Sequence, residues 1–382
     1  MSGVIVHEWI EETGGAEKVV ESFAEIFPDA PLLCLWNDAP RRFSNSVVRE
    51  SAIARTPIRK SKVAALPIMP LQWRRWKAGD ATWALVSSHL FAHHVRFRDA
   101  PDIERYIYVH TPARYIWSPD LDPRGSSAIA RTVAPMFRKL DARRAKEGGC
   151  YAANSDFVAE RVRRYWGIEA KTIYPPVAVS AIQSRPRWVE YLDRQELDMY
   201  ERLPQDFLLA ASRLVPYKRI DEAIRAAALT DLPLVVAGDG PDRARLESVA
   251  ESEKIPVYFL GRVSDALLFA LYQKSLAYIF LGVEDFGIMP VEAMAAGASV
   301  VGNSVGGVAE TVMDGITGAL CDPKDSAQLT DAVRRAIDCR PEKSAAHAQQ
   351  FDSIQFMREI TNWVGPEKVN SPRAHVWSGD KK

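Results

Sequence analysis

Short, continuous apolar runs alternate with helical patterns along the chain, and this alternation restricts the fold more than any other feature. Continuous apolar runs are typical of parallel strands that are covered on both faces. Helices between such strands supply the crossovers that parallel pairing requires. We therefore predict an α/β protein with doubly wound sheets. The predicted strands are residues 4–6, 84–87, 106–110, 150–153, 172–174, 207–211, 234–238, 257–260, 277–281 and 299–302.

One polar, proline-containing segment, residues 175–204, interrupts the alternation and is predicted to link two domains. The length of 382 residues fits this division, because single domains rarely exceed about 250–300 residues. We expect the first domain over residues 1–185 and the second over residues 204–348. A last helical stripe follows, with apolar side chains three residues apart at Phe351, Ile354, Met357, Ile360 and Trp363.

The charge balance and the cysteine spacing argue against several classes of protein. The 49 Lys and Arg residues equal the 49 Asp and Glu residues, whereas a dedicated nucleic-acid binder normally carries a basic excess. Four widely separated cysteines form no Cys-x-x-Cys pair, so we expect buried thiols in a reducing compartment. The first residues do not resemble a signal peptide, and no apolar run is long enough to span a membrane. We expect a cytoplasmic protein, either free or peripheral on the inner face of the plasma membrane.

Basic residues gather between positions 41 and 77, where Glu50 is the single acid. Apolar and aromatic residues, including Trp73 and Trp76, are interleaved with them. Two explanations stay open. Either the cations bind an anionic membrane with the tryptophans at headgroup level, or the cations only solvate a loop or the tryptophans pack inside the first domain. The basic residues are Arg41, Arg42, Arg49, Arg55, Arg59, Lys60, Lys62, Arg74, Arg75 and Lys77.

The segment 284–297 carries the clearest chemical pattern. It starts where the predicted strand 277–281 ends and enters a helix at a proline, a residue favoured in the first helical turn. Glu284 is therefore expected at the carboxyl edge of a sheet, where open α/β sheets bind ligands. Gly287 allows close backbone approach, and the N–H groups that follow can bind an anion. Glu292 either accepts hydrogen bonds from sugar hydroxyls or complements the helix dipole.

Glu284 and Glu292 flank the pattern Phe-Gly-x-x-Pro, which resembles the signature of retaining, nucleotide-sugar-dependent glycosyltransferases of family 4. The resemblance extends over nearly the whole chain and is stronger in the second half. It implies the GT-B fold, in which two Rossmann-like domains face a cleft and a C-terminal helix, here within residues 349–382, crosses back to the first domain. The similar segments are residues 13–17, 154–159, 174–177, 212–219, 237–241, 260–263, 306–310 and 315–318.

The resemblance also implies how a nucleotide-sugar donor binds. Arg213 and Lys218 form a clamp on the diphosphate, whose negative charge must be neutralised as the leaving group departs. Glu284 holds hydroxyls of the donor sugar, and Glu292 holds the ribose. The other implied donor-binding residues are Gly14 and Gly15 facing the diphosphate, Gly238 in a turn, Arg262 and Val263 beside the base, and Phe286, Gly287, Ile288 and Met289 at the helix start.

No metal and no cofactor are expected, because fixed cations and a helix N-terminus can neutralise a diphosphate. Asp120 and Asp122 form an Asp-x-Asp pattern, but prolines bracket it and we interpret it as a turn. His89 and His93 have helical spacing without the Glu-x-x-His pattern of a zinc site. We expect a helix without metal at these histidines and at the neighbouring His94.

His110 ends the predicted strand 106–110 and precedes the run Thr-Pro-Ala-Arg-Tyr. A single histidine is usually structural, but a strand end faces the cleft, and the position resembles that of the family's active-site histidine. The run is also similar to one in polysaccharide mannosyltransferases. His110 is therefore expected to act beside the donor sugar.

These features predict an enzyme, a retaining hexosyltransferase. No carboxylate is an obvious double-displacement nucleophile, so the resemblance implies same-face attack with help from the leaving phosphate. GDP-mannose is the first choice of donor and UDP-glucose the second. The expected acceptor is a glycan or a polyprenyl-diphosphate-linked glycan of cell-surface polysaccharide or glycolipid synthesis; no nucleic-acid partner is expected. The alternatives are a UDP-sugar transferase with a soluble acceptor and a nucleotide-sugar-binding relative without turnover.

Overall fold

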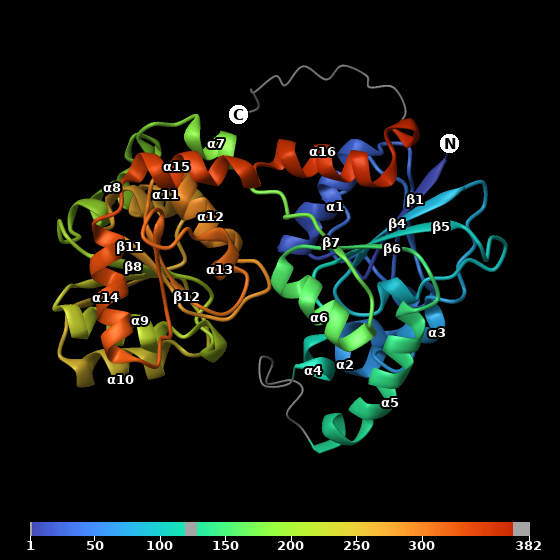
Figure 1. Ribbon diagram of the computed structural model, residues 1–382, viewed down its shortest axis with the longest axis horizontal. Coiled ribbons are helices and arrows are strands. Elements are labelled where there is room, and N and C mark those ends of the chain that lie inside the picture. Colours follow the sequence, from blue (N-terminus) through green and yellow to red (C-terminus); the bar gives the residue numbers. More distant parts are fainter. Residues whose placement is uncertain (1, 119–127, 370–382) are drawn as a thin grey trace.

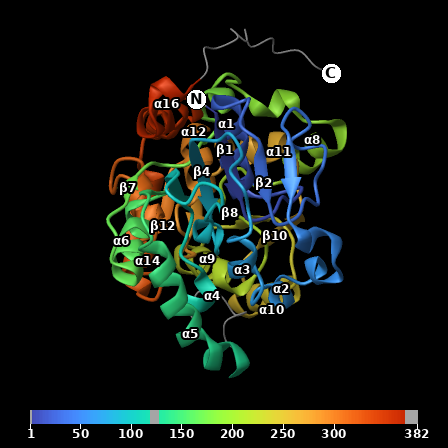
Figure 2. The ribbon, with the colours of Figure 1, turned by 90° about the vertical axis from the view of Figure 1, so that its right-hand side faces the viewer.

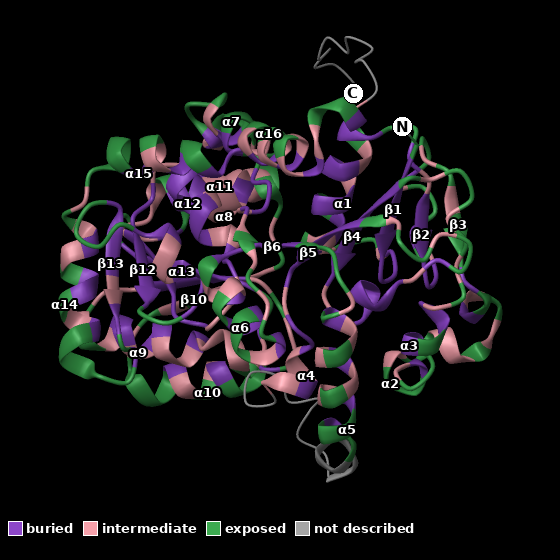
Figure 3. Ribbon diagram, turned by 45° about the vertical axis from the view of Figure 1, so that its right-hand side comes forward, coloured by how far each residue is buried: buried purple, intermediate pink, exposed green. Residues whose placement is uncertain are grey.

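Two parallel sheets, each at the centre of one domain, organise the chain (Figure 1). The computed structural model describes residues 2–118 and 128–369, without the side chains of residues 128–132. Buried residues follow the strands of both sheets, as the purple segments of Figure 3 show. The predicted α/β architecture with two doubly wound domains is therefore confirmed.

The first domain contains a seven-stranded sheet in which the chain starts near the middle and winds toward both edges. Strands β2 and β3 were not predicted, because β2 has three residues and β3 is a partly exposed edge strand with the polar sequence Val-Arg-Glu. In spatial order the strands are β3 (Val48–Glu50), β2 (Leu32–Cys34), β1 (Gly3–His7), β4 (Trp83–Ser88), β5 (Glu104–Val109), β6 (Cys150–Ala153) and β7 (Lys171–Thr172).

Helices cover both faces of this sheet. α1 (Gly15–Ile26) packs on one face, and α5 (Ala128–Ala145) and α6 (Asp156–Trp166) pack on the other. Short turns fill the connections: η1 (Ala52–Arg55), η2 (Pro57–Lys60), α2 (Lys62–Ala65), α3 (Met69–Gln72), η3 (Ala92–His94) and α4 (Arg114–Trp117).

The second domain contains a six-stranded parallel sheet. Its order is β10 (Val257–Gly261), β9 (Leu234–Ala237), β8 (Leu208–Ala211), β11 (Ala277–Phe280), β12 (Val300–Asn303) and β13 (Gly318–Cys321). One face is covered by α9 (Ile220–Thr230), α10 (Arg243–Glu253) and α14 (Ser326–Ile337). The other face is covered by α11 (Asp265–Lys274), α12 (Ile288–Ala295) and α15 (Pro341–Ala348), with the short η7 (Pro216–Lys218) and α13 (Val308–Thr311) in loops.

The segment 175–204, predicted to link the two domains, is itself largely folded. It contains α7 (Val179–Gln183), η6 (Trp188–Tyr191) and α8 (Arg194–Glu201). Val177, Val179 and Ile182 are buried in the core of the second domain. The chain therefore enters the second domain before residue 185, where we had placed the end of the first.

The chain returns to the first domain through α16 (Ser353–Val364), which follows η8 (Gln349–Phe351) and precedes η9 (Pro366–Lys368). α16 lies beside α1 in both views (Figures 1 and 2). Phe356 of α16 stacks on Phe23 of α1, with ring centroids 5.9 Å apart. The expected return of the C-terminal helix is confirmed for the described residues.

The two connections between the domains lie side by side. Val177 N donates to Phe351 O at 3.2 Å, and Ser353 N donates to Val177 O at 2.9 Å. The outgoing and the returning chain thus form one hydrogen-bonded, two-stranded connection.

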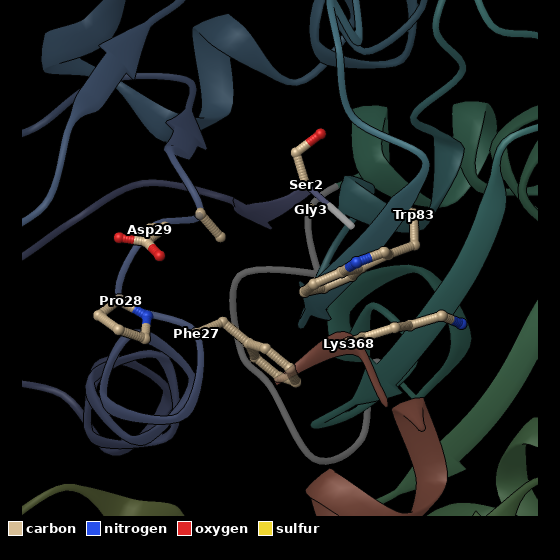
Figure 4. Close-up of a pocket in the computed structure, with 8 residues that line it drawn as sticks. Ser2, Gly3, Phe27, Pro28, Asp29, Trp83 and Lys368 are labelled. Carbon is tan, nitrogen blue, oxygen red and sulfur yellow. The ribbon is translucent and has the colours of Figure 1, made fainter. Parts of the chain in front are cut away.

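A small pocket of about 160 Å³ opens at the amino ends of β1 and β4 (Figure 4). The Trp83 ring lies beside Gly3 there, and Lys368 of η9 closes one side. Ligands of open α/β sheets bind at the carboxyl ends of the strands. This pocket therefore lies at the edge opposite to the predicted site.

Two of the four cysteines differ from the expectation of burial. Cys34 and Cys321 are buried, whereas Cys150, the first residue of β6, is exposed and Cys339 is half-buried. None of the described helices has the length and apolar character that crossing a membrane requires.

Candidate active site between the domains

Lys218 and Glu284 meet at the carboxyl edge of the second sheet. Strands β8 and β11 are neighbours, so the loops that follow them lie next to each other. Lys218 Nζ forms an ion pair with Glu284 Oε1. Gly282 makes this approach possible, because a Cβ atom there would stand 3.1 Å from Tyr217 O and 3.2 Å from Lys218 Cα. Two residues of the predicted donor site are thus brought together.

Arg213 belongs to the same loop after β8 and is exposed. Its Nη2 donates to the Tyr217 hydroxyl at 3.1 Å. Gly238 follows β9 with φ +129°, and a Cβ atom there would collide with the carbonyl of Ser212. The glycine turn is therefore required for the backbone of the two loops to pack.

The loop after β10 extends this edge. Arg262 is exposed and Val263 is half-buried. Since β10, β9, β8 and β11 are consecutive in the sheet, the loops after them form one continuous row. The row places Arg262 and Val263 at one end and Glu284 at the other.

Glu292 lies in α12, which begins after Gly287 at φ +91°. Its side chain is 17 % exposed, and Lys18 Nζ of the first domain lies 4.0 Å from Oε1. Burial raises the pKa of Glu292, while the charge of Lys18 opposes this change. Glu292 is therefore a mostly buried carboxylate at the domain boundary.

The four residues at the start of α12 differ in accessibility. Gly287 is buried, and Ile288 and Met289 are half-buried. The Phe286 side chain is a core group: it is 3 % exposed and packs on Tyr174 and Phe351. Only the backbone of Phe286 is available to a donor, which narrows the role expected for this residue.

Gly14 is the last residue of the loop between β1 and α1 of the first domain, and Gly15 is the first residue of α1. A Cβ atom on Gly15 would lie 3.3 Å from Ile288 Cδ1. The glycine loop of one domain therefore faces the helix start of the other, as expected for a site between them.

Asp285 joins the two domains. Its Oδ2 accepts from Arg114 Nε at 2.9 Å and from Arg114 Nη2 at 2.5 Å, and its Oδ1 accepts from Arg161 Nη1 at 2.6 Å. Ser155 Oγ, at the N-terminus of α6, donates to the Asp285 carbonyl at 2.5 Å. Asp285, the residue after Glu284, thus attaches the loop that carries Glu284 to the first domain.

A second contact between the domains involves Glu310 of α13. Its carboxylate accepts from Asp156 N at 2.7 Å and from Phe157 N at 2.6 Å. A carboxylate at a helix N-terminus is favourable, because it pairs with free N–H groups and with the helix dipole. Glu310 therefore caps a helix of the opposite domain.

His110 follows β5 directly and is 9 % exposed. Its Nε2 lies 2.8 Å from Ser87 Oγ of β4, and Ser87 Oγ lies 3.0 Å from His7 Nδ1 of β1. Burial lowers the pKa of His110 to about 4, against the effect of the Asp285 charge. His110 is therefore neutral near pH 7 and stands at the carboxyl edge of the first sheet.

His93 and His94 lie in the 3₁₀ turn η3 rather than in the expected helix. Their ring nitrogens and Asp141 of α5 could hold a metal ion, since the atoms lie within 4.8 Å of one another. Asp141 Oδ2 already accepts from Trp117 Nε1 at 2.7 Å and Trp166 Nε1 at 2.8 Å. Its Oδ1 lies 2.9 Å from His94 Nε2 and 3.1 Å from His93 Nε2.

The described side chains around Asp141 form a buried hydrogen-bond network. Burial alone raises the pKa of Asp141, but the two histidines outweigh it and lower that pKa below its usual range. Asp120 and Asp122, the other pattern considered for metal, lie outside the described residues.

Residues 196–351 match the glycosyl transferases group 1 family. The matching residues include the loops after β8, β9, β10 and β11, which carry Arg213, Lys218, Gly238 and Glu284. The group 1 match thus covers the row of loops that forms one wall of the site.

The curated relatives that match the chain carry different names. The glycogen synthase of Mycobacterium tuberculosis is 34 % identical over 185 residues, which are 46 % of this chain and 43 % of that protein. The phosphatidyl-myo-inositol mannosyltransferase of Mycobacterium leprae is 32 % identical over 174 residues, 44 % of each chain. The chain therefore matches less than half the length of these relatives.

Solved structures resemble nearly the whole chain. Anabaena HepE in complex with UDP has a TM-score of 0.71 and 18 % identity, over 95 % of this chain and 99 % of that one. WaaG, a glycosyltransferase involved in lipopolysaccharide biosynthesis, has a TM-score of 0.61 and 14 % identity, over 95 % and 99 %. The fold is GT-B.

Proposed function

We propose that the protein is a glycosyltransferase that moves a hexose from a nucleotide-sugar to a glycan or lipid-linked acceptor with retention of configuration. The observation that carries this proposal is the ion pair between Lys218 and Glu284 at the carboxyl edge of the second sheet. Across the domain boundary, Gly15 faces Ile288 and Lys18 faces Glu292 of α12. Cations, sugar-binding carboxylates and a helix start then surround one site, which suits a charged sugar nucleotide.

Each residue has a distinct task in this mechanism. Arg213 and Lys218 neutralise the diphosphate as the bond to the sugar breaks, Arg through its planar fork and Lys as a point charge. Glu284 orients donor hydroxyls, and Glu292 binds the ribose. The leaving phosphate assists deprotonation of the acceptor on the same face of the sugar. These fixed cations make the reaction independent of metal.

GDP-mannose is the proposed first donor, supported by the likeness of the His110 run to mannosyltransferases and by a mannosyltransferase among the relatives. A UDP-sugar is the second candidate, favoured by a structural relative that binds UDP. A binding protein without turnover is the remaining alternative, and the retained Lys218–Glu284 pair argues against it.

The acceptor is proposed to bind on the first domain. A hollow of about 640 Å³ lies beyond the carboxyl ends of β1 and β2. It is lined by Glu11, Trp36, Asp38, Arg59, Lys60 and Lys62. Acids that can bind hydroxyls and cations that can bind phosphate support a lipid-linked glycan as the acceptor, and with it the proposal that the protein works at the inner surface of the plasma membrane.

A donor panel tests the proposal. The purified protein is incubated with GDP-mannose, UDP-glucose and ADP-glucose, each with and without EDTA, and nucleoside diphosphate release is measured. We expect release from one donor above the others, unchanged by EDTA and strongly reduced in Lys218→Ala. NMR of the product gives the anomeric configuration. Equal, background release from all donors, with no donor raising the melting temperature, would overturn the proposal.

A further inference from the structure

Three buried side chains form a hydrogen-bonded line under the candidate site. They come from the carboxyl ends of adjacent strands: His7 from β1, Ser87 from β4 and His110 just after β5. His7 and Ser87 are fully buried. The single Ser87 hydroxyl links His7 Nδ1, at 3.0 Å, to His110 Nε2, at 2.8 Å.

The hydroxyl has one proton, and among the described residues its hydrogen-bond partners are the two rings. If the proton goes to one of them, the line can be ordered in two ways while both rings are neutral. If Ser87 donates to His110 Nε2, it accepts from His7 Nδ1–H, and the proton of His110 is on Nδ1. If Ser87 donates to His7 Nδ1, it accepts from His110 Nε2–H, and Nδ1 of His110 is a bare acceptor. Burial keeps both rings neutral, because it lowers the pKa of His7 to about 3 and that of His110 to about 4.

The surroundings of His7 favour the first of these two proton arrangements over the second. Its Nε2 is buried and has no hydrogen-bond partner among the described residues. The second order would put a proton on this nitrogen, and buried N–H groups without an acceptor are rare. The positive charge of Arg42 lowers the pKa of His7 and so helps to keep this ring neutral.

We propose that His7 and Ser87 are positioning residues that hold His110 in the Nδ1–H tautomer, so that His110 donates a hydrogen bond into the cleft. In the described residues Nδ1 of His110 makes no hydrogen bond, which leaves it available to a substrate oxygen. This inference rests on the proposed function. With the proton on Nδ1 and Nε2 occupied by the Ser87 hydroxyl, neutral His110 cannot act as the base for the acceptor hydroxyl. A donor N–H instead suits an oxygen of the nucleotide-sugar.

Nitrogen-15 NMR of the full-length protein labelled at histidine tests the tautomer directly. Two-bond ¹⁵N–¹H correlations distinguish a protonated from a bare ring nitrogen, and the seven histidines are assigned with His110→Gln. We expect His110 with protonated Nδ1 and bare Nε2. A protonated Nε2 with bare Nδ1 in the native protein overturns the proposal without any variant.

Two pairs of variants test the relay. Ser87→Ala and His7→Leu remove links and should give a mixture of His110 tautomers, whereas Ser87→Thr and His7→Gln keep a hydroxyl or an N–H donor and should preserve Nδ1–H. The native tautomer in both Ser87→Ala and His7→Leu would show that neither residue sets it. If Ser87→Ala does not fold, His7→Leu decides alone.

Kinetics distinguish positioning from a purely structural role. Ser87→Ala should lower kcat by about 10- to 100-fold, the usual loss when a functional histidine loses its orienting partner, with little change in KM for the donor. Ser87→Thr should restore most of kcat. Equal kcat in Ser87→Ala and the native enzyme would contradict the proposal. The NMR measurement needs no substrate, so its outcome is separate from that of the donor panel.

Discussion

Lys218 and Arg213 differ in their surroundings although they follow the same strand. Lys218 pairs with Glu284, whereas Arg213 is exposed and held by the Tyr217 hydroxyl. Replacing either by Ala should raise the barrier by roughly 2–4 kcal/mol, because a fixed donor to the leaving diphosphate is lost. Steady-state kcat/KM measures this, with the exposed Lys343→Ala of α15 as control. Unchanged kcat/KM in both cleft variants would contradict the diphosphate assignment.

Glu8 is a buried carboxyl beside the site that makes the stability of the protein depend on pH. Its Oε1 accepts from Leu90 N at 2.9 Å and Ala92 N at 2.7 Å, while Oε2 has no partner among the described residues. Burial raises the pKa of Glu8 from 4.5 to about 7. The folded state therefore binds this proton more tightly than the unfolded state.

Its contribution to stability is complete below pH 4.5 and is lost as the pH rises through 7. Relative to Glu8→Gln, which cannot ionise, the native protein should lose up to about 3 kcal/mol over this range. Urea unfolding at pH 4.5, 6 and 7.5 measures the difference between the two proteins. A difference that does not change with pH would show that Glu8 is not protonated in the folded state.

Single residues were predictable where the chemistry lay in a contiguous motif. Glu284 and Lys218 could be assigned from their motifs, and the structure brings them together. Asp285 stood in the same motif without an assigned role, because its partner Arg161 lies 124 residues away. The hydrogen bonds of Ser87 were also missed, because its partners His7 and His110 lie 80 and 23 residues away in the sequence. One signal was present: His7 ends β1 as His110 follows the end of β5.

At the scale of elements, continuous apolar runs were reliable and short or polar strands were not. The ten predicted strands correspond to strands of the structure, with β7 shifted to Lys171–Thr172. β13, Gly-Ala-Leu-Cys, was missed because its small residues give a weak apolar signal. Its burial comes from pairing with β12 and packing under α14, which local sequence does not specify.

The Asp141 network joins four elements of the first domain: η3, α4, α5 and α6. In Asp141→Asn the amide cannot accept on both sides, so hydrogen bonds to the indoles or to His94 are lost. Each is a bond to a charged acceptor, and we expect destabilisation of roughly 1.5–3 kcal/mol per lost bond. Urea unfolding measures it against the exposed Lys139→Ala on the same helix. Equal stability of the two variants would contradict this role.

The residues of the basic stretch 41–77 differ in burial and in ion pairing, although the sequence shows one continuous basic segment. Trp73 is fully buried in the core of the first domain, which is the alternative left open for the tryptophans, and it cannot lie at the headgroups of a membrane. Arg42, Arg59, Lys62 and Arg74 pair with Glu21, Asp38, Glu11 and Glu147. The exposed apolar groups are instead Val63, Ile68 and Leu71, in and between α2 and α3.

Membrane binding should therefore depend on the exposed cations Lys60, Arg75 and Lys77 around these apolar groups. Each contributes about 1 kcal/mol at an anionic surface, so the triple Gln variant should sediment far less with phosphatidylglycerol vesicles at low salt. The matched control replaces Lys254, Lys324 and Lys343 of the second domain by Gln. Equal sedimentation of both triple variants, or none of the native protein, would contradict membrane binding through this surface.

The whole molecule is held closed by a few polar contacts between its domains. Asp285 is central, since it accepts from two arginines of the first domain. Asp285→Asn weakens charged hydrogen bonds worth roughly 1.5–3 kcal/mol each, which should favour the open arrangement about tenfold or more. Small-angle scattering should show a larger radius of gyration. Glu160→Gln, which removes an exposed pair within the first domain, is the control; equal radii would contradict the prediction.

The alternation of strands and helices was sufficient to predict two doubly wound domains. It could not predict their contacts, because Arg114, Ser155 and Glu310 gain their roles only when the sheets face each other. It also could not show that residues 175–204 fold onto the second domain, since a few buried side chains among polar neighbours leave no periodic pattern.

The return of α16 to the first domain has a consequence for the order in which the protein is made. Phe356 and Ile360 cover the face of α1 around Phe23, yet they leave the ribosome only after the whole second domain. Translation of that stretch takes on the order of half a minute. During this time an apolar face of α1 is exposed to water and to chaperones. The domain that emerges first is the last to be completed.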